Sequence, residues 1–242
     1  MRSVRIYQPG EYTLNQFIDL SPEASRHVAL VLRMQPGQEI RLFCGDNHEY
    51  NAVICSCDKK KVQVKISSVE LINRESPRAI HLAQAVSKGE RMEMVIQKAV
   101  ELGTASITPL LTERSVVRLD AERLAKKQNQ WQAIAISACE QSGRNVIPAI
   151  HPPCSLPTYL QQCQAVLKFV LYPQASKSWR DYDFPPGDIA VLIGPEGGLS
   201  DSEIALAEQH QFQSLSLGPR ILRTETAAIT ALSVLQAVGG DL

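Results

Sequence analysis

Two loops near the C-terminus combine glycine, proline and charged residues in a way that suits ligand binding. The first, residues 193–200, reads Ile-Gly-Pro-Glu-Gly-Gly-Leu-Ser, and the second, residues 217–227, reads Leu-Gly-Pro-Arg-Ile-Leu-Arg-Thr-Glu-Thr-Ala. Each follows a stretch typical of a strand and precedes a stretch typical of a helix, which is where open α/β sheets bind ligands. Glycine allows close approach of the backbone, and proline holds a turn rigid. The two loops therefore predict one pocket built mainly from main-chain groups.

The motifs that are missing narrow the choice of ligand. A phosphate-binding P-loop ends in Gly-Lys-Ser/Thr, and the dinucleotide fingerprint GxGxxG has a different glycine spacing. In the first loop the glycines surround Glu196, whose negative charge disfavours a polyphosphate. A phosphate-free ligand with an adenine-like face and a positive centre fits this loop better. S-adenosylmethionine is such a ligand.

Both loops resemble the signature of the RsmE family, the 16S ribosomal RNA uridine N3-methyltransferases of the SPOUT superfamily. Matching motifs occur upstream in the expected order, so the resemblance extends over nearly the whole chain. They are His-Val at 27–28 with Val-Leu-Arg-Met at 31–34 and Gly37, Lys-Gly-Glu-Arg-Met-Glu at 88–93, Gln-Lys-Ala-Val-Glu-Leu-Gly at 97–103, Thr-Glu-Arg-Ser at 112–115 and Glu-Gln-Ser-Gly-Arg at 140–144. The resemblance implies methylation of N3 of a uridine in 16S ribosomal RNA, with S-adenosylmethionine as cofactor and with free RNA or the small ribosomal subunit as partner.

The chain changes character at a polar linker, residues 73–77, which ends in proline. Before it, short alternating strands and a helix capped by Ser21 indicate a small barrel. After it, strands and helices alternate, which is typical of an α/β domain with a parallel sheet. We therefore place the domains at 1–72 and 73–242. Expected strands are 40–42, 53–57, 62–66, 80–86, 107–111, 166–171 and 189–193, and expected helices are 21–34, 90–102, 120–139, 200–209 and 224–238.

The resemblance gives this organisation a more specific form. It implies a PUA-like, RNA-binding β-barrel domain followed by a SPOUT-type methyltransferase domain whose parallel sheet carries a trefoil knot. Residues 224–238 are apolar around most of the predicted helix, and such a helix is buried on all sides. Its cover is either the sheet of the same subunit or a second subunit. The resemblance implies that this C-terminal segment passes through a loop and that the protein is a homodimer.

Cofactor contacts are expected from the two loops and from the end of the strand before them. The expected residues are Leu171, Tyr172, Ile193, Gly194, Pro195, Glu196, Gly197, Gly198, Leu217, Gly218, Ile221, Leu222, Arg223, Thr226 and Ala227. Methyl transfer to uracil N3 also requires removal of the imide proton, which leaves negative charge on N3, O2 and O4. Arg223 is the candidate for stabilising that anion, and Glu225 or Glu196 is the candidate general base. A structural salt bridge is the alternative role for Arg223 and Glu225.

The balance of charge differs along the chain, although the net charge is zero. Residues 151–242 hold 5 Lys and Arg against 9 Asp and Glu, so the first two thirds supply most cations for a polyanion. Phosphate contacts dominate RNA binding, and the alternative for each cation is a solvated surface charge. The RNA-binding candidates in loops and at helix starts are Arg5, Arg26, Arg33, Lys88, Arg91, Arg114 and Arg144.

Several classes of protein do not fit this sequence. No stretch is long and apolar enough for a membrane span, no secretory signal is evident, and the six cysteines and five histidines lack zinc-ligand spacing. We therefore expect a cytoplasmic protein without a metal. Two functions compete with the uridine N3-methyltransferase: a ribosome-assembly factor that binds RNA without catalysis, and a ribose 2′-O-methyltransferase of the same superfamily. The sequence Arg-Thr-Glu-Thr at 223–226 argues against the latter, and both intact loops argue against the former.

Overall fold

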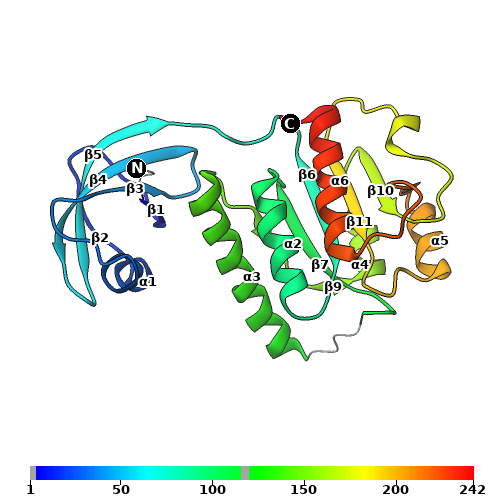
Figure 1. The fold of residues 1–242 in the computed structure, drawn as a ribbon, viewed down its shortest axis with the longest axis horizontal. Helices are drawn as coiled ribbons and strands as arrows, with labels where there is room; N and C mark the ends of the chain where they lie inside the picture. The colour runs from blue at the N-terminus through cyan, green and yellow to red at the C-terminus, as the bar shows by residue number, and fades with distance from the viewer. Residues whose placement is uncertain (1–3, 116–119) are drawn as a thin grey trace. The chain divides into compact units, whose positions relative to one another are not determined.

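The computed structural model describes residues 4–115 and 120–242. The chain forms two compact units (Figure 1). Met1–Glu75 and Cys139–Ile147 make up the first, and Ser76–Ala138 and Pro148–Leu242 make up the second. The first unit is therefore built from two separate stretches of chain, because the segment Cys139–Ile147 joins the N-terminal residues.

The first unit contains, over its described residues, a sheet of five strands in the order β1-β3-β4-β5-β2. The strands are β1 (Val4–Tyr7), β2 (Phe17–Asp19), β3 (Glu39–Phe43), β4 (His48–Cys57) and β5 (Val62–Leu71). The β4–β5 pair is antiparallel, which confirms the predicted hairpin. Alternate residues such as Val62, Val64 and Ile66 are fully buried in the core of this unit, as expected where one face of a sheet is covered.

Helix α1 (Pro22–Arg26) packs in this unit and is shorter than the sequence predicts. Its predicted cap is confirmed, because Ser21 Oγ accepts a hydrogen bond from Ala24 N at 3.1 Å. The prediction of a continuous helix over 21–34 is wrong in its second half. There the chain forms a π-helical turn, η1 (His27–Val31), in which Leu32 N donates to His27 O at 2.9 Å. This i to i+5 bond widens the turn beyond α-helical geometry.

The second unit is built on a sheet of seven strands within the described part of the chain, in the order β12-β10-β11-β6-β7-β8, with β9 beside β7. All pairs in it are parallel. The strands are β6 (Ile80–Ala85), β7 (Ser106–Leu111), β8 (Ala149–Ile150), β9 (Cys154–Ser155), β10 (Leu167–Leu171), β11 (Ile189–Ile193) and β12 (Gln213–Leu215). This parallel sheet confirms the predicted α/β class. The trefoil knot stays a prediction.

Helices cover both faces of this sheet. They are α2 (Glu90–Glu101), α3 (Ala121–Ser142), α4 (Leu156–Gln162), α5 (Asp201–Gln209) and α6 (Thr224–Gly239), with a short 3₁₀ turn η2 (Trp179–Asp181). Helices α2 and α6 lie together over one face (Figure 1). On the other face, Ala190 and Leu192 of β11 pack against α4 and α5 in an apolar cluster that includes Leu160 and Ile204. The carboxyl ends of β10, β11 and β12 are thereby fixed on both sides.

Two helix predictions near the loops can be compared directly with the structure. Helix α5 begins with the predicted capping box: Ser200 Oγ accepts from Glu203 N at 3.2 Å, and Glu203 Oε2 accepts from Ser200 N at 2.9 Å. Helix α6 is buried on one side within this single chain, so the prediction that a sheet or a second subunit covers all its sides stays a prediction. Ala228, Ala231, Leu232 and Leu235 are buried, whereas a second side of the helix is only half-buried.

A search of the described residues finds no helix that is both long and apolar enough to cross a membrane. Nor do residues 4–115 and 120–242 contain a group of three or more His, Cys, Asp and Glu side chains that could hold a metal ion.

Candidate active site

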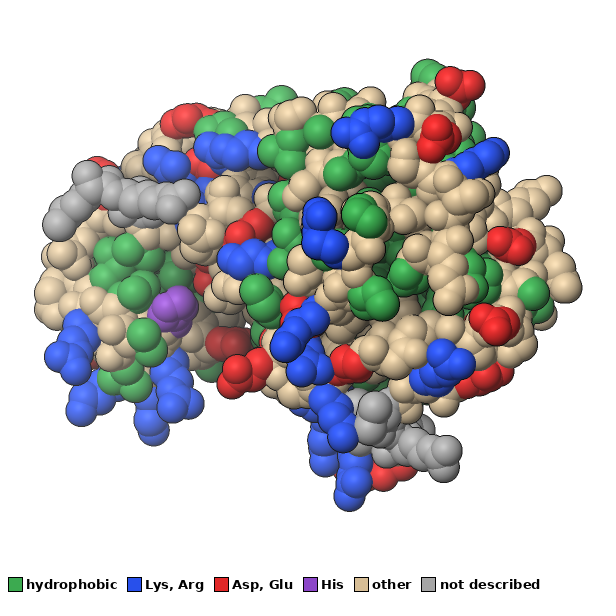
Figure 2. Space-filling view, turned by 45° about the vertical axis from the view of Figure 1, so that its right-hand side comes forward, with side chains coloured by type: hydrophobic (Ala, Val, Ile, Leu, Met, Phe, Trp, Pro, Cys, Tyr) green, Lys and Arg blue, Asp and Glu red, His purple; other side chains and the backbone are tan. Residues whose placement is uncertain are grey.

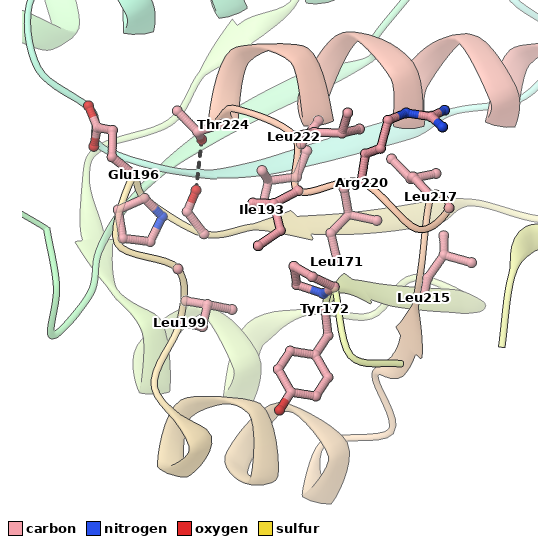
Figure 3. Close-up of a pocket in the computed structure, with 17 residues that line it drawn as sticks. Leu171, Tyr172, Ile193, Glu196, Leu199, Leu215, Leu217, Arg220, Leu222 and Thr224 are labelled. Carbon is pink, nitrogen blue, oxygen red and sulfur yellow. Dashed lines mark hydrogen bonds between the residues drawn. The ribbon is translucent and has the colours of Figure 1, made fainter. Parts of the chain in front are cut away.

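The two glycine–proline loops face one hollow at the carboxyl ends of neighbouring strands (Figure 3). Its walls come from the end of β10, from the loop after β11 and from the segment between β12 and α6. The hollow has an empty volume of about 800 Å³, including space open to solvent, which lies within the range of small-molecule clefts. The sequence-predicted cofactor residues that line it are Leu171, Tyr172, Ile193, Gly194, Pro195, Glu196, Gly198, Leu217, Gly218, Ile221, Leu222 and Ala227.

The middle of the hollow is apolar, and charged groups lie at its ends. Figure 3 shows Leu171, Ile193 and Leu222 side by side in the middle. Glu196 and Arg220 lie at opposite ends of the same view. An apolar slot with few polar groups at its margins is the common pattern of a cofactor pocket.

Glycine is required in the first loop because the chain folds back on itself there. A Cβ on Gly194 would lie 3.0 Å from Leu199 N and 3.3 Å from the Gly198 carbonyl carbon, so the backbone of the loop would have to shift by a few tenths of an ångström. Gly198 has a φ of 70°, which favours glycine. Its N–H donates to Pro195 O at 2.9 Å and closes the turn. The loop is therefore a tight turn whose wall toward the hollow is main chain.

Arg114 also fixes this loop. Its Nη1 donates to Gly197 O at 3.1 Å and to Leu199 O at 3.3 Å. Gly197 is accordingly turned toward Arg114 and is not among the residues that line the hollow. Arg114, predicted to bind RNA, thus supports the cofactor loop in this structure.

Glu196 is held by a cationic group from the first turn of α2 and by a main-chain N–H from the segment before that helix. Arg91 Nη1 donates to Glu196 Oε1 at 3.0 Å, and Lys88 N donates to the same oxygen at 3.2 Å. Partial burial alone would raise the pKa of Glu196, but these hydrogen bonds and that of its own backbone N–H outweigh it and hold the pKa below its ordinary value. Glu196 is therefore ionised at neutral pH and is a weak base.

The start of α6 contains the predicted catalytic residues, which do not line the hollow. Arg223 is exposed at the N-cap of α6, and Thr226 is exposed one turn further on. Glu225 is half-buried, and its Oε2 is buried without a hydrogen-bond partner among the described residues. The expected cofactor contacts of Arg223, Thr226 and Gly197 thus have no support in the lining of the hollow.

The hollow also has walls that the sequence did not predict. These residues are Pro173, Leu199, Leu215, Arg220 and Thr224. Four of them lie in or directly beside the predicted motifs. That they face the hollow depends on the path of the backbone, which a sequence motif does not reveal. Thr224 has the clearest role, because its Oγ1 donates to Gly194 O at 2.7 Å and connects the two loops (Figure 3).

The structure separates the predicted RNA-binding residues into two groups. Arg26, Arg33, Lys88, Arg91 and Arg114 are exposed, so they can reach a polyanion, although Arg91 and Arg114 also donate hydrogen bonds to the first loop. Figure 2 shows Lys and Arg side chains at several places on the surface, interspersed with Asp and Glu side chains. Charge alone therefore does not mark one RNA-binding face in this view.

Arg5 and Arg144 are held by partners within the first unit. The buried carboxylate of Glu49 pairs with Arg5, with Arg41 at 3.0 Å and with Arg74 at 2.6 Å. Arg144 is 4% exposed and pairs with Glu75. Guanidinium groups in these positions are occupied by carboxylates of their own unit. The structure thus gives both side chains partners within their own unit, and their contact with RNA stays a prediction.

The three arginines around Glu49 also change the pKa of its carboxyl group. Burial alone would raise the pKa of Glu49, but the hydrogen bond from Arg74 and the charges of Arg5 and Arg41 outweigh it and lower the pKa. Glu49 is thus ionised at neutral pH. Its charge holds three arginines around one point of the first unit.

Comparison with known families agrees with this fold and site. An RNA methyltransferase domain matches residues 74–236, and an RNA methyltransferase PUA domain matches residues 20–67. Together with the parallel sheet and the hollow at its carboxyl edge, these matches define an α/β RNA methyltransferase with an N-terminal PUA domain.

Individual relatives specify the family. Ribosomal RNA small subunit methyltransferase E of Buchnera aphidicola subsp. Schizaphis graminum is 38% identical over 100% of this chain and 98% of its own length, and that of Bacillus subtilis is 35% identical over 89% and 88%. The chain belongs to the family of ribosomal RNA small subunit methyltransferases E, which confirms the resemblance to RsmE proteins.

Solved structures resemble the whole chain. A Legionella pneumophila protein solved with the bound cofactor S-adenosylmethionine has a TM-score of 0.98 and 59% identity, with full coverage of both chains. Ribosomal RNA small subunit methyltransferase E from Neisseria gonorrhoeae, bound to S-adenosylmethionine, has a TM-score of 0.93 and 36% identity, again over 100% of both chains. The fold of this chain is therefore similar to the folds of both solved proteins over their whole length.

Proposed function

We propose that this chain transfers a methyl group from S-adenosylmethionine to N3 of a uridine in 16S ribosomal RNA. The observation that carries the proposal is the convergence of two glycine–proline loops on one hollow at the carboxyl edge of the sheet. Membership of the methyltransferase E family and the S-adenosylmethionine found in two structural neighbours support it.

The residues of the hollow fit this cofactor. Leu171, Ile193 and Leu222 offer apolar surfaces for an adenine ring, and the turn at Gly194 brings main-chain groups close to a ligand. The ionised Glu196 lies at one end and provides negative charge for a cationic ligand. When bound, S-adenosylmethionine supplies an electrophilic methyl group on a positively charged sulfur. The chain itself then has to hold the uracil and take up its proton.

Residues at the start of α6 are suited to that second task. Arg223 is exposed and next to Thr224, which lines the hollow, so its guanidinium can meet the O2 or O4 of a deprotonated uracil. Glu225 Oε2 has no hydrogen-bond partner within the described chain. Glu196 is the poorer base, because its hydrogen bonds lower its pKa. We assign anion stabilisation to Arg223 and proton removal to Glu225.

The first experiment separates this function from its two competitors. The purified protein is titrated with S-adenosylmethionine by calorimetry and then incubated with it and with 16S RNA or small ribosomal subunits. Mass analysis of the digested nucleosides is expected to show one methyl group on uracil N3. A methyl group on ribose would establish the 2′-O-methyltransferase instead, and an absence of cofactor binding would favour the assembly factor.

Two neighbouring arginines allow a matched test of the catalytic assignment. Arg223→Ala is expected to lower kcat by about 100-fold, the typical cost of removing one group that stabilises an oxyanion, and to leave the Kd for S-adenosylmethionine nearly unchanged. Arg220→Ala is the control, because Arg220 lines the hollow and should affect the Kd more than kcat. Equal loss of kcat and affinity in Arg223→Ala would contradict a role in catalysis.

For RNA binding we propose the exposed cations Arg26, Arg33, Lys88 and Arg91. Each phosphate contact contributes to the salt dependence of binding, with a slope of roughly 0.7 to 0.9 per contact. Substitution of Arg26 or Arg33 by Gln should therefore reduce the salt slope of 16S RNA binding by about one. An unchanged slope would show that the residue is a solvated surface charge.

We also propose that the protein is a cytoplasmic homodimer. The support is the incomplete burial of α6, on which the apolar side chains of Ile229, Val234 and Val238 are only half-buried. A partner subunit would remove this surface from water. Sedimentation equilibrium is expected to give twice the mass of one chain, and Val234→Glu should shift the distribution toward monomer. A monomeric wild-type protein at micromolar concentration would contradict the proposal.

A further inference from the structure

A chain of three hydrogen-bonded groups lies beneath the hollow. Gln84 of β6 is completely buried, and its Nε2 donates to Thr224 Oγ1 at 3.0 Å and to Ala85 O at 3.1 Å. Thr224, the first residue of α6, donates from the same Oγ1 to Gly194 O at 2.7 Å (Figure 3). The network thus connects a central strand, the first loop and the end of the second loop.

The direction of these bonds is fixed by the groups themselves. A threonine hydroxyl has one hydrogen, and a carbonyl oxygen can only accept, so Thr224 must donate to Gly194 and accept from Gln84. Both hydrogens of the Gln84 amide are then in use. Gln84 Oε1 is buried without a hydrogen-bond partner within the described residues, which a solely structural glutamine would be expected to avoid.

The bond to Gly194 is important because the peptide it holds has a single hydrogen-bonding group. The next residue is Pro195, which has no N–H, so the 194–195 peptide can be held only through its carbonyl oxygen. Thr224 supplies the donor for that oxygen. Residues 218–221, in the second loop, are exposed and end shortly before Thr224. One hydroxyl therefore restrains both loops.

We propose that Thr224 and Gln84 are positioning residues that set the separation of the two loops, and thereby the affinity of the hollow for S-adenosylmethionine. The proposal rests on the proposed function for the identity of the ligand. Neither side chain takes part in the chemistry: Gln84 orients the Thr224 hydroxyl, and the hydroxyl orients the peptide that leads into the first loop.

Loss of the central hydroxyl should act on binding more than on folding. Thr224→Val has nearly the same shape but leaves the Gly194 carbonyl without its donor, Thr224 Oγ1. We expect this loss to reduce the population of the ligand-competent loop about ten-fold. Thr224→Ser keeps the hydroxyl and should restore the Kd to within about three-fold of wild type. Gln84→Leu removes the donor to Thr224 and should weaken binding to a similar extent.

Gln236 provides a matched control in the same helix. It is 1% exposed near the other end of α6, where its Nε2 donates to Leu102 O at 2.7 Å and its Oε1 accepts from Ser76 Oγ at 2.8 Å. Gln236→Leu thus removes an equally buried glutamine from the same unit. It should lower the thermal midpoint of unfolding and leave the Kd for S-adenosylmethionine unchanged.

The experiment combines calorimetric titration of S-adenosylmethionine with amide hydrogen exchange of the ligand-free protein. Thr224→Val and Gln84→Leu are expected to weaken binding about ten-fold and to speed exchange in residues 196–199, whereas Thr224→Ser and Gln236→Leu should do neither. Unchanged binding and exchange in folded Thr224→Val, or an equal effect of Gln236→Leu, would overturn the proposal. If the wild-type protein failed to bind S-adenosylmethionine while exchange still depended on Thr224, the proposed function would fail and the loop coupling would stand.

Discussion

Replacement of Gly194 by alanine is a direct test of the geometry of the cofactor loop. The added methyl group would lie 3.0 Å from Leu199 N, 3.1 Å from Leu199 Cγ and 3.3 Å from the Gly198 carbonyl carbon. Two of these atoms belong to the backbone of the same loop, so the contact can be relieved only if the wall of the hollow moves. Crowding of this kind costs about 1–3 kcal/mol. We expect the Kd for S-adenosylmethionine to rise by roughly 5- to 150-fold, if the cost falls on the ligand-competent loop.

Gly197→Ala is the matched control, because it makes the same change three residues further along the loop. Its methyl group would meet only Arg114 Cβ at 3.5 Å and Cδ at 3.6 Å, which are ordinary contacts. Calorimetry with S-adenosylmethionine should therefore show a near wild-type Kd for Gly197→Ala, and circular dichroism should show both variants folded. Equal affinities of the two variants would refute the reasoning, whether both were weakened or neither was.

Three further predictions concern stability. Glu49→Gln should lower the free energy of unfolding in urea by about 3 kcal/mol at pH 7, because it leaves buried guanidinium groups without their carboxylate. Since the pKa of Glu49 is lowered on folding, its contribution is present above the pKa of the unfolded state and disappears as the pH falls through the folded value, so the two proteins should converge in acid. Glu140→Gln should instead raise the free energy of unfolding at alkaline pH. Burial raises the pKa of Glu140 despite its hydrogen bond from Tyr7 N, so the native carboxyl favours folding below its unfolded pKa and loses that advantage as the pH rises through the folded value. The variant should therefore be the more stable protein at pH 8 but not at pH 4, and a constant difference across that range would contradict this. Ser200→Ala should cost about 1 kcal/mol through loss of the α5 cap, measured by the same urea titration, while an unchanged midpoint would show that the capping box contributes little.

The sequence was sufficient to locate the cofactor hollow because its walls are local. A glycine–proline turn after an apolar strand has few possible conformations, and neighbouring parallel strands bring such turns to one edge of the sheet. Gly194 and Gly198 are therefore where the motif predicts them. The direction in which each residue of the turn faces is harder to predict. Gly197, inside the same motif, faces Arg114 instead of the hollow.

Long-range contacts could not be predicted from the pattern of residues. Arg5 and Arg144 are about 140 positions apart in the sequence. The charge of an arginine alone does not show whether it binds a phosphate or pairs with a buried carboxylate. One indication of the network beneath the hollow is present in the sequence, because Gln84 is a polar residue near the end of an apolar strand. Its partner Thr224, however, is 140 positions away. Nothing in the pattern of residues indicates that the first α-helix ends at Arg26. The π-helical turn η1 continues the apolar pattern of α1 and differs from it in its hydrogen bonds.

The discontinuity of the first unit has a consequence for protein synthesis. When residue 75 leaves the ribosome, the segment that supplies Glu140, Arg144 and Asn145 to that unit has not yet been made. At about 5–20 residues per second, the ribosome needs roughly 4–14 s more to add the segment that ends at Ile147. During this interval the Arg5 side chain lacks Asn145 as its acceptor, and the backbone N–H of Tyr7 lacks Glu140. The sheet and apolar core of the first unit lie within residues 4–71, so we expect the nascent N-terminal part to gain these last contacts only after residues 139–147 have emerged.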